Sequence, residues 1–146
     1  MTQSVSTCLW FNDKAEEAVK FYTSLLPGSR ILETSRYGKD MPGPEGAVLT
    51  VTFTLGGREF MALNGFSDSP FTQAHSMVVN CDTQEEIDRL WDALGDGGKP
   101  VACGWITDRY GLSWQIVPRV MMRYVAEGHP QKFGRVMAAM MRMVKL

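Results

Sequence analysis

Residues 76–95, SMVVNCDTQEEIDRLWDALG, decide the fold, because the hydrophobic pattern changes its period within a few positions. Ser76 to Asn80 is a short apolar run, typical of a strand. Thr83, with Glu86 three residues later, forms a capping box, which marks the start of a helix. The apolar positions that follow recur at helical spacing and stop before Gly95: Ile87, Leu90, Trp91 and Leu94. This stretch therefore predicts a strand followed by a helix.

The same unit occurs earlier in the chain. A shift of 69 residues (85 minus 16) places Glu16-Glu17 on Glu85-Glu86, and four apolar positions coincide as well: Ala18, Phe21, Tyr22 and Leu25. The earlier unit begins with the apolar run Val5 to Phe11, and its helix is expected to be capped by Asp13 with Glu16 reaching back. The chain is thus expected to contain one structural unit twice.

Each expected helix is followed by β-type sequence with hairpin turns at Gly56-Gly57 and Tyr110-Gly111. The expected strands are Arg30–Tyr37, Ala47–Leu55 and Arg58–Asn64 in the first half, and Pro100–Thr107 and Leu112–Val117 in the second. One helix cannot cover both faces of a sheet. We therefore expect an α+β fold in which two βαβββ modules form an eight-stranded half-barrel around a cavity, the usual kind of place for a ligand.

The length of 146 residues predicts a single domain, with module one at about 5–66, module two at about 74–118 and a helical tail at 119–146. The tail has an apolar stripe at helical spacing: Phe133, Val136, Met137, Met140, Met141 and Val144. Two interpretations of this stripe stay open. It packs on the core or across a homodimer, or it forms a methionine-lined lid over a ligand.

Composition excludes several kinds of partner. A net charge of −1, from 15 basic and 16 acidic residues, gives no basic surface for nucleic acid or an anionic membrane. The sequence shows neither a signal peptide nor a membrane-spanning run, so a cytoplasmic location is expected. Cys8, Cys81 and Cys103 are widely spaced and odd in number, which favours structural thiols over disulfides or a zinc site.

Four stretches resemble a known family: LWFNDKAEEAVKFYTSLLPGSRI, FTLGGREFMALNG, SMVVNCDTQEEIDRLWDAL and CGWITDRYGLSWQIVP. They resemble the PhnB-like branch of the vicinal oxygen chelate superfamily, which has the glyoxalase/bleomycin-resistance fold. Its members often carry the name 3-demethylubiquinone-9 3-methyltransferase. The resemblance implies paired βαβββ modules, a cleft on the inner face of each sheet and a homodimer. Metal-using relatives place a His or Glu on the first and last strand of each module.

By this resemblance, the four ligand positions fall on or near Thr7, Asn64, residues 74–76 and Gln115. Only His75 among these residues is a normal transition-metal ligand. Gln115 replaces a Glu of the metal-using relatives and brings no negative charge, so we expect neither a bound metal nor another cofactor. The amides of Gln115 and Asn64 are expected either to face the cavity and bind a polar ligand, or to bond only to backbone or to each other.

Aromatic side chains at Trp10, Trp105 and Phe53 are candidates for the cavity wall. Strand alternation turns Trp114 away from Gln115 and into the core. Asp108 and Arg109 are expected in a surface turn or in an ion pair across the dimer. His75 is a candidate ligand-binding residue or general base, with a purely structural role as the alternative.

These features favour a protein that binds a small organic molecule without catalysing a reaction, and they leave the question of catalysis open. The alternative is a metal-assisted lyase, isomerase or dioxygenase that uses His75. Methyl transfer, the activity in the family name, is not favoured, because Gly56-Gly57 and Gly97-Gly98 do not form a glycine-rich turn between a strand and a helix.

Overall fold

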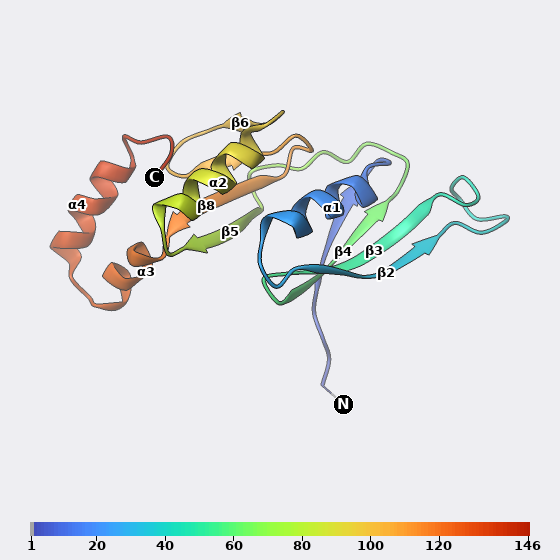
Figure 1. Cartoon of the computed structure of the whole chain (residues 1–146), viewed down its shortest axis with the longest axis horizontal. Coiled ribbons are helices and arrows are strands. Elements are labelled where there is room, and N and C mark those ends of the chain that lie inside the picture. Colours follow the sequence, from blue (N-terminus) through green and yellow to red (C-terminus); the bar gives the residue numbers. More distant parts are fainter. Residues whose placement is uncertain (1) are drawn as a thin grey trace. The chain divides into compact units, whose positions relative to one another are not determined.

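The computed structural model describes residues 2–146, and the chain divides into two compact units, Met1–Ser69 and Pro70–Leu146 (Figure 1). Each unit contains one four-stranded mixed sheet. The first is ordered β1-β4-β3-β2 and the second β5-β8-β7-β6, so the same strand order occurs twice. The expected α+β class with two βαβββ units is thereby confirmed.

Unit 1 contains β1 (Thr7–Phe11), α1 (Ala15–Leu25), β2 (Arg30–Arg36), β3 (Val48–Leu55) and β4 (Arg58–Asn64). Strands β1 and β4 are parallel, whereas β2, β3 and β4 form an antiparallel meander. Helix α1 covers one face of this sheet, and the core between them is formed by alternate strand positions and the apolar stripe of the helix: Leu9, Phe11, Ala18, Val19, Tyr22, Val51, Phe53, Phe60 and Ala62.

The start of α1 differs from the sequence expectation. Asp13 does not cap the helix: the N-cap residue is Lys14, whose side chain makes no capping hydrogen bond. Instead the backbone N–H of Ala15 donates to Oδ1 of Asn64 at 2.9 Å, while Nδ2 of Asn64 donates to the carbonyl of Val48 at 3.1 Å. A helix start leaves backbone N–H groups without intrahelical partners, and here the last residue of β4 supplies one acceptor.

Unit 2 contains β5 (Ser76–Cys81), α2 (Gln84–Gly95), β6 (Lys99–Pro100), β7 (Trp105–Thr107) and β8 (Ser113–Pro118). Thr83 caps α2 as expected, since its Oγ1 accepts from the N–H of Glu86 at 3.2 Å. Helix α2 covers one face of the sheet, with a core of Cys81, Ile87, Leu90, Leu94, Ile106, Leu112, Trp114 and Ile116.

The run Pro100–Thr107, expected as one strand, is two short strands with a connection between them. Cys103 and Gly104 interrupt it with positive φ angles of 55° and 82°. Their N–H groups donate to the carbonyls of Met143 and Val144, each at 2.8 Å. The strand is interrupted because this segment bonds to the end of the chain.

The tail forms α3 (Arg119–Ala126) and α4 (Pro130–Met140). Nζ of Lys132 lies 4.7 Å from the centroid of the Tyr124 ring, a cation–π contact that joins the two helices. The apolar stripe continues to Val144, but α4 ends at Met140 and the last residues return toward α2 and β6 (Figure 1). Within residues 2–146, no helix is long and apolar enough to cross a membrane.

Candidate functional site

The candidate site lies in unit 2, on the face of the sheet opposite α2. Alternation along β8 buries Trp114 on the α2 face, at 1% exposure, and places Gln115 on the other face. In the register of the sheet, Gln115 pairs with Trp105 of β7 and with Val78 of β5. These three side chains therefore form a row across neighbouring strands.

The tail provides the opposite wall of this site. The sheet face and the two tail helices line a partly open cavity of about 590 Å³, within the range of small-molecule sites. The sheet and its loops contribute Gln73, Val78, Asn80, Val101, Ala102, Cys103, Trp105, Gln115 and Val117, and the tail contributes Met121, Met122, Val125, Phe133, Met137, Met140 and Met141. The tail therefore lies over the sheet face opposite α2, and packing across a homodimer and a methionine-lined lid over a ligand both stay predictions.

The cavity wall carries neutral hydrogen-bonding groups and no charged side chain. Nε2 of Gln115 donates to Oγ of Ser76 at 2.9 Å, and within residues 2–146 this is the one hydrogen bond of that side chain. Its Oε1 is therefore available as an acceptor. The indole N–H of Trp105 has no hydrogen-bonding partner in the described part of the chain. The wall thus offers a neutral acceptor at Gln115 and a neutral donor at Trp105, and the amide side chains of Gln73 and Asn80 also line it.

The turn that joins β7 to β8 is built around Asp108, which is only 3% exposed. Its Oδ1 accepts from the N–H groups of Tyr110, at 2.8 Å, and Leu112, at 3.0 Å. Its Oδ2 accepts from Nε1 of Trp114 at 2.9 Å. The expectation of a surface position for Asp108 was therefore wrong, because its carboxylate satisfies three buried donors. The neighbouring Arg109 instead pairs with Asp96 at 3.5 Å.

Of the candidate residues in unit 1, Asn64 and Phe53 lie on the face that α1 covers. Asn64 is 3% exposed, and both groups of its amide bond to backbone, which was one of the two alternatives left open. Phe53 is fully buried and its ring stacks on Phe60 with centroids 5.7 Å apart. Both side chains therefore contribute to the core of unit 1.

Trp10 is half-buried and lies on the other face of the first sheet, since it alternates with the buried Leu9 and Phe11. Its Nε1 donates to the carbonyl of Ser67 at 2.9 Å. Its ring lies directly against Gly65, where a Cβ atom would come within 1.9 Å of the indole. Trp10 is thus held in place by the segment that follows β4.

His75 and the cysteines complete the set of candidates. His75 is exposed immediately before β5 and does not line the cavity. All three cysteines are free. Burial raises the pKa of the Cys81 thiol, which disfavours a nucleophilic thiolate there. Cys103 lines the cavity, and its Sγ lies 3.7 Å from Sδ of Met141.

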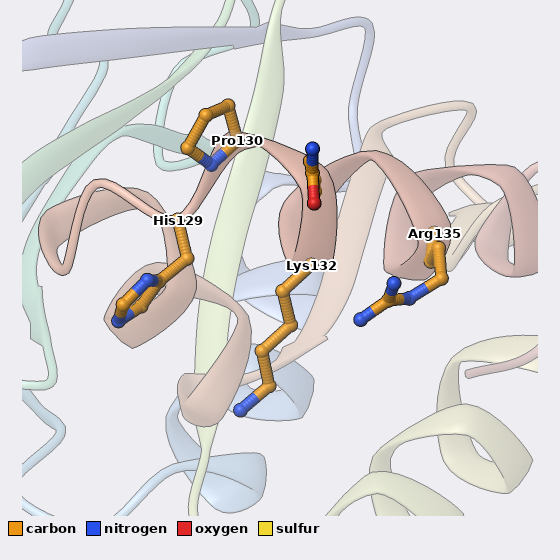
Figure 2. Close-up of a pocket in the computed structure, with 5 residues that line it drawn as sticks. His129, Pro130, Lys132 and Arg135 are labelled. Atoms are coloured by element: carbon orange, nitrogen blue, oxygen red, sulfur yellow. The ribbon is translucent and has the colours of Figure 1, made fainter.

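Two other hollows are weaker candidates. One of about 410 Å³ is lined by residues 129–135 alone, and Figure 2 shows the side chains of His129 and Lys132 extending from the same side of that segment. No strand contributes to it. Another, of about 510 Å³, lies beside α1, where Lys20 pairs with Glu16 at 2.8 Å and Lys14 with Glu17 at 3.7 Å. Its two lysines pair with its two glutamates at exposed positions, where such pairs are weak.

Comparison with known proteins identifies the family to which the chain belongs. The model of the family named 3-demethylubiquinone-9 3-methyltransferase matches residues 3–117. The chain belongs to this family. A PhnB protein from Bacillus cereus with the same family name is 42% identical, with a TM-score of 0.72 over 80% of this chain and 99% of that one. No curated protein matches.

More distant structures share the fold of this PhnB-like protein. Glyoxalase I of Leishmania major is 15% identical, with a TM-score of 0.55 over 92% of this chain and 99% of that one. The fosfomycin resistance protein FosX of Mesorhizobium loti is 10% identical, with a TM-score of 0.56 over 86% of this chain and 98% of that one. These two likenesses show that the chain shares the fold of glyoxalase I and FosX.

The donor set of this PhnB-like protein does not fit a divalent metal at the positions that the resemblance indicated. Asn64 uses both groups of its amide on backbone, and Gln115 is a neutral amide bonded to Ser76. Within residues 2–146, no three His, Cys, Asp or Glu side chains are grouped so as to hold a metal ion. Neutral amides do not offset the cost of dehydrating a divalent cation.

Proposed function

We propose that this protein binds a small, uncharged organic molecule, without a metal, in the cavity between the second sheet and the tail. The observation that carries the proposal is the cavity itself. It has about 590 Å³ of space and a largely apolar wall that includes Trp105, with Gln115 as a hydrogen-bonding group. Sites of this size and composition hold drug-sized ligands.

The wall also indicates the chemistry of the ligand. An anionic ligand would lose its hydration without gaining a cationic partner, which is costly in an apolar site. A neutral molecule with a hydroxyl or carbonyl group loses much less, because Oε1 of Gln115 and the indole N–H of Trp105 can replace water. Trp105 and Phe133 offer aromatic surface for a planar ring.

The test is a titration with Nile red, a neutral fluorescent probe, followed by displacement with 2-naphthol or with the anion 2-naphthoate. We expect 2-naphthol to displace the probe at lower concentration than 2-naphthoate. Trp105→Ala should weaken both Nile red and 2-naphthol, and Gln115→Leu should weaken 2-naphthol about fivefold, the value of one neutral hydrogen bond. Leu32→Ala, which removes an exposed side chain from β2 of unit 1, is the control.

Two results would contradict the proposal. Binding of Nile red that is unaffected by Trp105→Ala would place the probe elsewhere. Stoichiometric retention of Zn²⁺, Ni²⁺, Co²⁺ or Mn²⁺ after dialysis, lost in Gln115→Leu, would show that the site holds a metal.

A further inference from the structure

We infer that the tail, residues 119–146, is a specificity element added to the family fold, which restricts the cavity to uncharged, apolar ligands. This inference rests on the proposed function. The match to the family model ends at residue 117, so the tail lies outside the matched region. The tail nevertheless supplies seven of the sixteen residues that line the cavity.

The tail residues at the cavity share one chemistry. Five of the seven are methionines, and the other two are Val125 and Phe133. Methionine is unbranched and polarisable, so it adapts its shape to different apolar ligands. The charged side chains of the tail are absent from the cavity wall: Arg119, Arg123, Glu127, Lys132, Arg135, Arg142 and Lys145. Without the tail, the sheet face with Gln115 and Trp105 would be open to water and to charged molecules.

The tail is fixed to unit 2 at both of its ends. At its start, α3 follows β8 directly, and Nε of Arg119 pairs with Oδ1 of Asp82 at 2.7 Å. At its end, the carbonyls of Met143 and Val144 accept from Cys103 and Gly104. Two contacts with α2 follow: Lys145 pairs with Asp88, and Nε2 of Gln84 donates to the carbonyl of Leu146 at 3.2 Å.

Gly104 shows how closely the end of the tail is seated. A Cβ atom at this position would lie 2.9 Å from a side-chain carbon of Leu146, and its φ is 82°. The positive φ and a distance of 2.9 Å from the same Cβ position to the carbonyl oxygen of Ile116 favour glycine here, and Leu146 packs directly against it. Because a cavity of about 590 Å³ remains beneath this fixed tail, the tail is a wall of the site and does not fill it.

The experiment compares Nile red binding to the full chain and to three variants. The first lacks residues 143–146, which releases the fixed end. The second combines Met137→Ala and Met140→Ala, which opens the wall. The third, Met143→Ala, is the matched control, since its side chain does not line the cavity. We expect the first two variants to bind Nile red about 50 to 100 times more weakly than the full chain does. This is the loss expected when about 100 Å² of apolar ligand surface remains exposed to water. The control should bind like the full chain.

Hydrogen exchange at the amides of Cys103 and Gly104 reports whether the tail is docked, and exchange at the amide of Asp108, which donates to the carbonyl of Leu112, reports whether the sheet is folded. In the shortened variant, only the first two should lose protection. Nile red binding that depends on Trp105 but is unchanged in both tail variants would overturn this inference and leave the proposed function standing. Absence of binding to the full chain would overturn both.

Discussion

Replacing Asp108 by asparagine tests whether the buried turn between β7 and β8 depends on the charge of this side chain. In the structure, Oδ1 accepts from two backbone N–H groups and Oδ2 from the indole of Trp114. An asparagine keeps the first oxygen, but its NH₂ group then faces the indole N–H, so two donors oppose each other. A lost bond to a charged acceptor and an unsatisfied buried donor together cost about 2–4 kcal/mol. A chain of this length should lose roughly 6–12 °C in Tm.

A double-mutant cycle separates the effect of two opposed donors, the asparagine NH₂ group and the indole N–H, from the general effect of removing the charge. Trp114→Phe removes the indole N–H while keeping an aromatic ring in the core. In that background Asp108→Asn should cost about 1–2 kcal/mol less than in the unmodified chain, because no donor faces the amide. Urea unfolding followed by circular dichroism gives the four free energies. An equal cost of Asp108→Asn in both backgrounds would refute the assigned bond between Oδ2 and the indole.

Three further predictions concern other contacts. Asn64→Ala should lower the free energy of unfolding by about 1–3 kcal/mol, because it removes a helix cap and a buried hydrogen bond, and it should leave Nile red binding unchanged in a parallel titration. Gly65→Ala should displace the ring of Trp10 and destabilise the protein by about 1–3 kcal/mol, measured by urea unfolding and by a shift in tryptophan emission. Hydrogen bonds from Lys145 and Gln84 lower the pKa of Asp88, so the carboxylate stabilises tail docking above the ordinary aspartate pKa. This contribution is lost as pH falls through the lowered pKa, and Asp88→Asn should remove the corresponding fall in the protection factors of the docked amides, measured by hydrogen exchange relative to the intrinsic rate at each pH.

The repeated units were predictable because their signals are local. The capping box at Thr83 and the helical stripe of α2 lie within one continuous stretch, and alternation along β8 correctly separated Trp114 from Gln115. Each of these inferences needs only neighbouring residues. The roles of Gln115 and Trp105 in ligand binding remain predictions.

The errors arose where a residue far along the chain decides the local structure. Asn64 caps α1 from 49 positions away, so the nearby Asp13 was chosen instead. The run 100–107 is divided because Cys103 and Gly104 bond to residues 143–144, which no local pattern records. Asp108 carried a usable signal: an acid at the start of a tight turn accepts from N–H groups two and four positions later, which predicts burial when a tryptophan follows.

The bonds from Cys103 and Gly104 to the end of the chain also affect self-association. Unpaired N–H groups along the margin of a sheet can recruit a strand from another molecule, which is a route to aggregation. Here the two amides are occupied by residues of the same chain. The end of the tail therefore also covers two amides in the connection between β6 and β7 that could otherwise pair with another molecule, and we expect any change that loosens it to lower colloidal stability together with the proposed ligand binding.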